Sequence, residues 1–450
     1  MTVLPVGPYK VLKTAEGEMP WYVMPFDRDG LCTGPETRKH LMAAVANEPF
    51  TDIYLFSHGW NNGWKEATDR YQSFIDGYAK LRAAHNLALP DGYRPLFVGL
   101  FWPSIVLLTE REQEPQILAD GEPNEDAIVE ERERVAELAA AVNPAQRDRF
   151  YALVERAELS RDEAQELAGL LQPVYGQTDD ELPIGASPAP VNIVNGWVAA
   201  SHAPLATTTK KMFGAVGGGP TAGAQTASLW GDTLKRILPR DVIRLATVYQ
   251  MKDRAGKVGA SGVRVLIEEL FVRNEKARLH LLGHSYGAKV LLSALATATL
   301  KPGRKAHSML LLQPAVSHLC FAEKLPGSNA AGGYHGVPER VARPIFATYS
   351  AHDFALHDVF HRALWRSADK GEAAIAAFDG APPNIYAALG GYGPRESGEA
   401  LIDITLPTKA LDLTKRARLY GVDGTATISG HGAISNESTW WLSHCASWQD

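Results

Sequence analysis

A five-residue motif in the second half of the chain restricts the fold more than any other feature. Gly283-His284-Ser285-Tyr286-Gly287 lies directly between the apolar runs RLHLL and AKVLLSALA. The first run is typical of a buried strand and the second of an apolar helix. A chain that passes from strand to helix within so few residues must turn sharply, and the flanking glycines leave room for that turn. The motif therefore predicts a strand–turn–helix unit in an α/β protein.

The segments around this motif alternate between strand and helix patterns. Strand, helix and strand follow one another at 53–56, 67–84 and 96–102, which is a βαβ unit and predicts a mainly parallel central sheet flanked by helices. Before this unit we expect two short strands and a helix, at 9–12, 21–26 and 36–46. After it we expect a helix at 262–273 and further strands at 241–249, 307–315, 343–353 and 416–425.

The pattern changes between about residues 105 and 239. Residues 124–172 are acidic and helical in character, and Ser160 with Glu163 forms a capping box. Residues 182–228 are rich in Gly, Pro, Ala and Thr. We interpret 105–239 as a helical cap followed by a loose segment, inserted into a core formed by 1–104 and 240–450. The alternative is a solvated helical excursion without a role at any site.

Charge and cysteine content exclude several classes of protein. The net charge is −6 and no block of Lys and Arg stands out, so a nucleic-acid partner is not expected. The three cysteines lie far apart, which argues against a disulfide framework and against a zinc knuckle. No secretory signal pattern is visible, and the longest apolar stretch, FVGLFWPSIVLL, is too short to span a bilayer. We therefore expect a cytoplasmic protein without a transmembrane segment.

Ser285 is the predicted nucleophile. In a strand–turn–helix with the pattern G-x-S-x-G, the serine is held in a strained backbone conformation. It also lies at a helix N-terminus, where the positive end of the helix dipole favours a developing oxyanion. The motif alone is weak evidence in a chain of this length, but its position between strand and helix supports the prediction.

The loop 57–63 is the predicted partner of this serine in holding an oxyanion. It follows the buried strand at 53–56, and we expect the backbone N–H groups of Trp60 and Tyr286 to be the two donors. We also expect His58, Gly59 and Trp102 to contact the substrate. The alternative is an ordinary strand-exit turn, since Gly and Asn favour turns. A phosphate-binding P-loop is excluded because its Gly-Lys-Ser/Thr ending is absent.

Asp353 and His431 are the predicted acid and base. In the fold that carries a G-x-S-x-G motif between a strand and a helix, the three residues follow along the chain in the order serine, acid, histidine. Asp353 ends the strand-like run at 343–353, and His431 lies between two glycines after the last predicted strand. Asp358 and His444 are the alternatives, and both fall in predicted helices.

A histidine-rich segment raises the possibility of a metal site. His357 and His361 are four residues apart, as metal-binding histidines on one helix face can be, and His352 is nearby. The glutamate of a metalloprotease motif is missing and no third-ligand cluster is apparent. We therefore expect no metal and no cofactor.

Taken together, these motifs resemble a bacterial α/β-hydrolase family of largely uncharacterised function. The resemblance rests on LFSHGWNN, GLFWPS, HLLGHSYGAKVLLSAL, SAHDFAL and the late glycine-flanked histidine, and it covers 50–104 and roughly 240–435. It implies the α/β-hydrolase fold and the triad Ser285, Asp353 and His431. The chain departs from the family pattern in having Trp60 where a tyrosine is usual and in its long insertion.

The expected activity is hydrolysis of a carboxylic ester or related acyl bond, by a carboxylesterase or lipase. The insertion favours a small-molecule or lipid-like acyl ester as the partner, because a cap can bury an apolar acyl chain. The alternatives are an amidase, peptidase or acyltransferase with the same triad, and a binding protein that keeps the fold without turnover. The sequence leaves the oligomeric state open.

Overall fold

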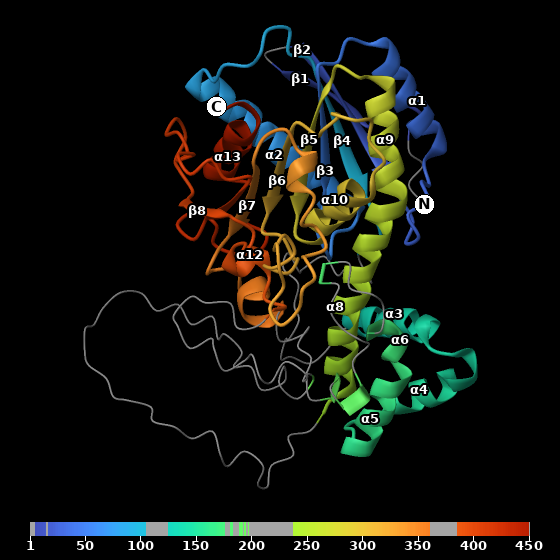
Figure 1. The fold of residues 1–450 in the computed structure, drawn as a ribbon. Coiled ribbons are helices and arrows are strands. Elements are labelled where there is room, and N and C mark those ends of the chain that lie inside the picture. Colours follow the sequence, from blue (N-terminus) through green and yellow to red (C-terminus); the bar gives the residue numbers. More distant parts are fainter. Residues whose placement is uncertain are drawn as a thin grey trace, which may run out of the picture.

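A nine-stranded mixed sheet forms the centre of the protein (Figure 1). The computed structural model describes residues 5–14, 17–104, 125–175, 181–182, 189–191, 193–194, 197, 237–360 and 385–449. The strand order is β1-β2-β4-β3-β5-β6-β7-β9-β8; the β1–β2 pairing is antiparallel and the remaining pairings are parallel. The strands are β1 (Lys10–Thr14), β2 (Gly17–Pro25), β3 (Asp52–Ser57), β4 (Pro95–Phe101), β5 (Arg278–His284), β6 (Ser308–Leu312), β7 (Ile345–Tyr349), β8 (Ala400–Asp403) and β9 (Leu419–Asp423).

Helices cover both faces of this sheet, which explains the continuous apolar runs of its central strands. Side chains alternate along β3: Leu55 lies in a core with helices α1, α8, α9 and α10, whereas Phe56 lies in a second core with α2 and α13. The helices span α1 (Pro35–Asn47), α2 (Trp64–His85), α8 (Pro239–Val258), α9 (Arg264–Arg273), α10 (Tyr286–Thr297) and α13 (Glu437–Trp448). The α/β class with a mostly parallel sheet is thus confirmed.

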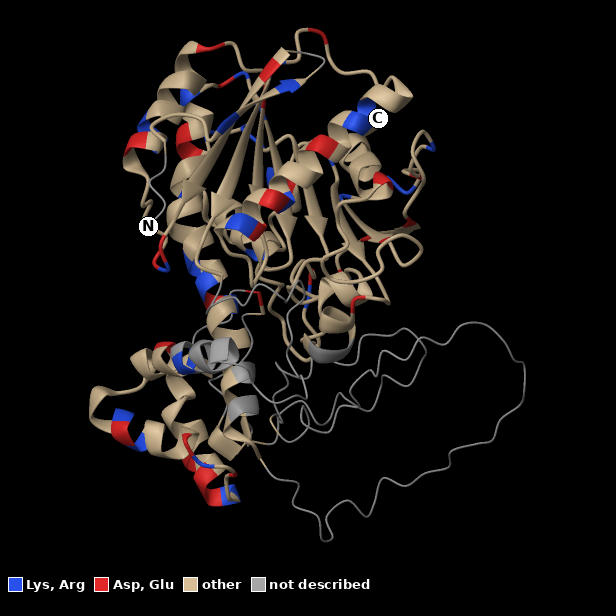
Figure 2. Cartoon of the chain, turned by 180° about the vertical axis from the view of Figure 1, so that it is seen from behind, with Lys and Arg blue, Asp and Glu red and all other residues tan. Residues whose placement is uncertain are grey.

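The described helices of the insertion are α3 (Glu125–Ala141), α4 (Arg147–Val154), α5 (Arg161–Leu170) and the short α6 (Gln172–Tyr175). Of these, α3, α4 and α6 pack against α8, and α5 packs against α4 and α6. The predicted capping box is present, because Ser160 and Glu163 each bond to the backbone of the other. Figures 1 and 2 show these helices gathered around one end of α8, away from α9. The predicted loose segment at 182–228 lies outside the described residues except for a few positions.

A buried ion-pair cluster joins the insertion to the core. The carboxylate of Glu181 lies 2.9 Å from Nζ of Lys289 and 3.4 Å from Nζ of Lys252, and it accepts the N–H of Ser317 at 2.9 Å. All three charged side chains are buried. The turn Gly283–Gly287, from here on called the elbow, leads into α10, and Lys289 lies one helical turn after Ser285. This part of the insertion is therefore fixed close to the elbow.

The predicted strand at 241–249 is wrong, because these residues belong to α8. The run is rich in Val, Ile and Thr, which suggested a strand. However, its buried positions include Val242, Ala246 and Tyr249, at the spacing of one helix face. Pro239 begins the helix, where proline is well tolerated. The sequence interpretation also missed β8, a four-residue edge strand that is largely exposed on one face.

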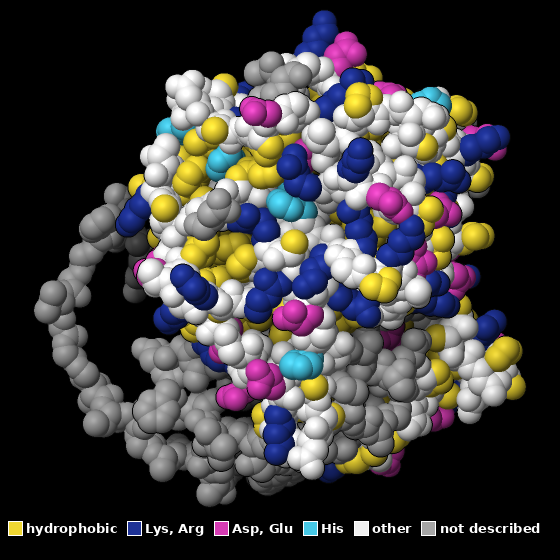
Figure 3. Space-filling view, turned by 45° about the horizontal axis from the view of Figure 1, so that its top comes forward, with side chains coloured by type: hydrophobic (Ala, Val, Ile, Leu, Met, Phe, Trp, Pro, Cys, Tyr) yellow, Lys and Arg dark blue, Asp and Glu magenta, His cyan; other side chains and the backbone are white. Residues whose placement is uncertain are grey.

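The surface of the protein mixes charged and apolar side chains. Figure 3, which brings the top of Figure 1 forward, shows Lys and Arg dispersed among apolar, acidic and histidine side chains. Within the described residues, no helix is long and apolar enough to cross a membrane.

Candidate active site

Ser285 occupies a strained turn between β5 and α10. Its backbone has φ 55° and ψ −126°, a conformation that residues other than glycine rarely adopt. Neighbouring segments hold it there: the Ser285 N–H donates to the carbonyl of Leu312 at 3.1 Å, and the Ser285 carbonyl accepts the N–H of Ala315 at 3.2 Å. The turn thus has the backbone geometry that the G-x-S-x-G motif predicts.

Two glycines let the end of β3 approach this turn closely. A Cβ on Gly287 would lie 2.1 Å from the carbonyl oxygen of Ser57, which no side chain tolerates. A Cβ on Gly59 would lie 2.5 Å from Cβ of Ser285. The loop after β3 is therefore in direct contact with the serine.

The structure brings Ser285, His431 and Asp353 together in one hydrogen-bonded chain. Nε2 of His431 lies 2.8 Å from Oγ of Ser285, and its Nδ1 lies 2.8 Å from Oδ2 of Asp353. An ionised carboxylate only accepts, so Nδ1 carries the proton and Nε2 accepts the serine hydroxyl. The side chains are buried, with 3%, 7% and 0% of Ser285, His431 and Asp353 exposed. This arrangement is suited to proton transfer from the serine hydroxyl to the imidazole.

The alternative base, His444, does not take part in this hydrogen-bonded chain. The side chain of Asp358 lies outside the described part of the structure, and Asp353 is the carboxylate that contacts His431. His444 lies in α13, where its Nδ1 is 3.2 Å from the hydroxyl of Tyr78 and its ring stacks on Trp441. Burial lowers the pKa of His444 to about 4.

The side chains of His58 and Trp102 hold the loop after β3. Nδ1 of His58 donates to the carbonyl of Gly59 at 2.9 Å, and its Nε2 accepts the backbone N–H of Trp102 at 3.2 Å. The two rings stack with an interplanar angle of 5°. Burial lowers the pKa of His58 to about 4, so the ring stays neutral and uses one nitrogen as donor and the other as acceptor. Both side chains are buried, and their predicted contact with substrate stays a prediction.

Asn62 fixes the same loop at Gly59 and Trp60, close to Ser285. Its Nδ2 donates to the carbonyls of Gly59 and Trp60, at 3.1 and 2.8 Å. With these carbonyls turned toward Asn62, the peptide that carries the Trp60 N–H has a fixed orientation. The ring of Trp60 is partly exposed and lies 6.2 Å from the ring of Tyr286. Tyr286 is the first residue of α10, where a backbone N–H has no acceptor within the helix.

Three polar residues of the site were not predicted: His284, Arg70 and Gln313. His284 donates from Nε2 to the backbone carbonyl of His431, and Gln313 donates from Nε2 to Asp353, both at 2.9 Å. Arg70 on α2 donates to the carbonyl of Gly432 at 3.2 Å. His284 stands inside the elbow motif, but its partner is 147 residues away and no sequence signal joins the two. Arg70 and Gln313 belong to no motif.

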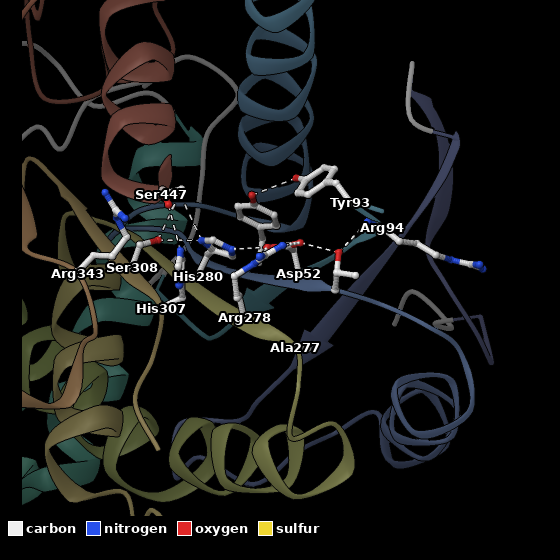
Figure 4. A network of polar contacts seen from close by, with 12 residues as sticks. Asp52, Tyr93, Arg94, Ala277, Arg278, His280, His307, Ser308, Arg343 and Ser447 are labelled. Atoms are coloured by element: carbon white, nitrogen blue, oxygen red, sulfur yellow. Dashed lines mark hydrogen bonds and ion pairs between the residues drawn. The ribbon is translucent and has the colours of Figure 1, made fainter. Parts of the chain in front are cut away.

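A second Ser–His–Asp arrangement lies at the amino-terminal ends of the central strands, where Asp52 begins β3 and Ser308 begins β6; Figure 4 shows its contacts. His280 contacts Asp52 and Ser308, both at 2.9 Å. Although burial disfavours the charged form, hydrogen bonds from Arg278 and His280 hold the pKa of Asp52 below its ordinary value. Ser308 is simply the first residue of β6, in extended backbone without an elbow, and the His280 ring is fully buried. Ser308 thus has a hydrogen bond to a histidine without the strained turn that holds Ser285.

The histidine-rich segment after β7 forms no metal cluster in the part of the chain that the structure describes. His352 is exposed, and the ring of His357 stacks on Tyr392 with centroids 4.4 Å apart. His361 lies outside the described residues.

Comparison with known proteins finds no matching family model, no matching curated protein and no matching solved structure.

Proposed function

We propose that the protein is a serine hydrolase of the α/β-hydrolase fold that cleaves carboxylic ester or related acyl bonds. The observation that carries the proposal is the chain Ser285–His431–Asp353, with both hydrogen bonds at 2.8 Å, built on a strained turn between a strand and a helix. This combination of nucleophile, base and orienting acid is what activates a serine hydroxyl. Ser308 differs from Ser285 in this respect, because it has a hydrogen bond to a histidine but no strained turn between a strand and a helix.

The first step is acylation. His431 takes the hydroxyl proton of Ser285 as its oxygen attacks the carbonyl carbon, and Asp353 stabilises the imidazolium that forms. The negative charge moves to the carbonyl oxygen, for which the N–H groups of Trp60 and Tyr286 are the proposed donors. When the tetrahedral intermediate collapses, His431 gives its proton to the leaving alkoxide, and an acyl group remains on Ser285.

The second step releases the acid. Water loses a proton to His431 and attacks the acyl carbon, and the resulting intermediate expels the Ser285 oxygen, which recovers its proton from His431. Every proton that moves is carried by His431. The steps consume water and need no group beyond the side chains and backbone of the site.

We favour an esterase or lipase, since the insertion joins the core near the elbow. Glu181 fixes the chain beside α10 through Lys289, and α3, α4 and α6 pack on α8. A cap in this position is suited to covering an apolar acyl chain and excluding water on closing.

A serine-reactive fluorophosphonate probe tests the proposal, with Ser285→Ala and Ser308→Ala as a matched pair. Both substitutions remove a serine hydroxyl that is hydrogen-bonded to a histidine, but Ser285 alone has the elbow. We expect the native chain and Ser308→Ala to be labelled and to hydrolyse p-nitrophenyl esters. Ser285→Ala should lose both, with turnover falling on the order of a million-fold.

The outcomes separate the candidate functions. Labelling without hydrolysis of esters of any chain length, combined with cleavage of anilides, indicates an amidase. No labelling of the native chain at Ser285 contradicts the proposal and favours a binding protein that retains the fold.

A further inference from the structure

Gln313 contacts the carboxylate that orients the proposed base. Its Nε2 lies 2.9 Å from Oδ2 of Asp353, the same oxygen that His431 Nδ1 contacts at 2.8 Å. Gln313 is fully buried at the end of β6, next to β5 in the sheet. Oδ1 of Asp353 accepts the N–H of Leu356 at 3.0 Å, so the carboxylate is held from both oxygens.

The surroundings determine which end of the Gln313 amide faces Asp353. The Asp353 carboxylate and the Gly390 carbonyl accept hydrogen bonds from the NH₂ end, at 2.9 and 3.3 Å. The hydroxyl of Thr348 accepts the backbone N–H of Gln313 at 2.9 Å and donates its own hydrogen to Oε1 at 3.0 Å. Each polar atom of the amide thus has a partner, and reversing the amide would place two oxygens against each other.

The backbone of Gln313 is also unusual. Its φ is 45°, in the left-handed region that a side chain other than glycine rarely adopts. Its neighbours Leu312 and Ala315 make the two backbone hydrogen bonds that hold Ser285, whose φ is also positive. Two strained residues therefore end two adjacent strands, one with the nucleophile and the other with a donor to the acid. Strain of this kind persists only where surrounding contacts impose it, and it concentrates at functional sites.

From this geometry we infer that Gln313 is a positioning residue of the active site, which fixes Asp353 so that Oδ2 faces His431. The inference rests on the proposed function for its catalytic consequence. The amide donates to the carboxylate without adding charge, and it restricts the rotation that would turn Oδ2 away from the imidazole. Outer partners of this kind set the orientation of the groups that carry out chemistry.

Gln313→Glu is the sharpest test, because it keeps the size of the side chain and replaces the NH₂ by an oxygen. Two carboxyl groups at this distance share one proton, so Asp353 stabilises the imidazolium of His431 less well. We expect kcat for an ester to fall on the order of 10-fold with little change in KM. The acid limb of the pH profile of kcat/KM should move to lower pH, which a loss of fold or of active protein does not cause. Gln72→Glu, on the surface of α2, is the matched control and should leave both unchanged.

NMR of the His431 Nδ1 proton tests the positioning role without relying on activity. The resonance is identified by its loss in His431→Gln, and it should move upfield in Gln313→Glu as the hydrogen bond to Asp353 weakens. Thr348→Val, which removes the hydroxyl that orients the amide, should move it in the same direction by less. If the resonance is the same in Gln313→Glu and in the native chain, the inference is wrong. If the native chain neither hydrolyses esters nor reacts with the probe while the resonance responds as expected, the proposed function fails and the positioning role stands.

Discussion

Nε2 of His284 lies 2.9 Å from the backbone carbonyl oxygen of His431. A carbonyl only accepts, so the residue that precedes the proposed nucleophile donates a hydrogen bond to the backbone of the proposed base. The elbow thus holds the base at two points, through the Ser285 hydroxyl and through the His284 ring. Burial, with the nearby Arg70 charge, keeps the pKa of His284 well below its ordinary value, so the ring is neutral.

Replacing His284 should therefore affect the base and not the nucleophile itself. Gln places an N–H close to the position of the imidazole Nε2, whereas Leu removes it. We expect His284→Leu to lower kcat on the order of 10-fold, because the loop that carries His431 loses a donor, and His284→Gln to retain more of the activity. Steady-state kinetics on one ester checks this order. Equal losses in the two variants would contradict a role for the hydrogen bond.

Asp353 and Ser285 should behave as a single unit. Asp353→Asn leaves His431 in place but presents an amide to Nδ1, and it should lower kcat on the order of 10⁴-fold. Adding Ser285→Ala to this variant should cost almost nothing beyond the effect of Ser285→Ala alone, since the members of a triad act together. Residual rates of the single and double variants measure this. A larger loss from Asp358→Asn or His444→Ala would show that the acid or the base is misassigned.

The contact between Gly59 and Ser285 gives a third prediction. A Cβ at residue 59 would lie 2.5 Å from Cβ of Ser285 and 3.0 Å from Nδ1 of His284, so Gly59→Ala must displace the loop. We expect kcat to fall by roughly 10²- to 10³-fold, the usual effect of losing one oxyanion donor. Gly336→Ala is the matched control, because a Cβ there meets nothing within 4 Å. Retained activity in Gly59→Ala would remove this loop from the mechanism.

The sequence predicted the parts of the fold in which local pattern and burial agree. β3, β5 and β6 are buried on both faces, so their apolar runs were visible without tertiary information. The elbow was also visible, because its turn needs particular residues at fixed spacing. The strand predicted at 241–249 failed for the opposite reason: β-branched residues are compatible with a helix when tertiary packing against α3 and α10 buries one of its faces.

The hydrogen bonds that hold the proposed triad and the loop after β3 in place could not be predicted from local sequence pattern. Asp353 and His431 were predicted because serine, acid and histidine follow one another in that order along the chain in the α/β-hydrolase fold, which the sequence motifs resemble. Gln313 and His284 act through partners that are 40 and 147 residues away, and their residue types are unremarkable at those positions. His58 holds the loop after β3 through both of its ring nitrogens, and its contact with substrate stays a prediction. Only the packed structure shows which hydrogen bond each of these side chains makes.

Buried neutral histidines should make the protein lose stability in mild acid. Burial lowers the pKa of His58 and of His318 to about 4, below the ordinary value near 6.5 that the unfolded chain has. Between these two values the unfolded chain binds protons that the folded chain does not, so the free energy of unfolding decreases as the pH falls. The full contribution is present above about pH 6.5, and it declines toward pH 4.

His318→Asn tests this linkage away from the proposed site. Nδ1 of His318 donates to the carbonyl of Ala387 at 3.0 Å, and the Asn amide supplies a similar donor that does not titrate. Urea unfolding at several pH values between 7.5 and 4.5 should show a shallower pH dependence in the variant, by up to about 1.4 kcal/mol per pH unit. His85→Asn, at an exposed position on α2, is the control and should leave the slope unchanged. If His318→Asn and the native chain lose stability in parallel as the pH falls, buried His318 is not a source of the acid sensitivity.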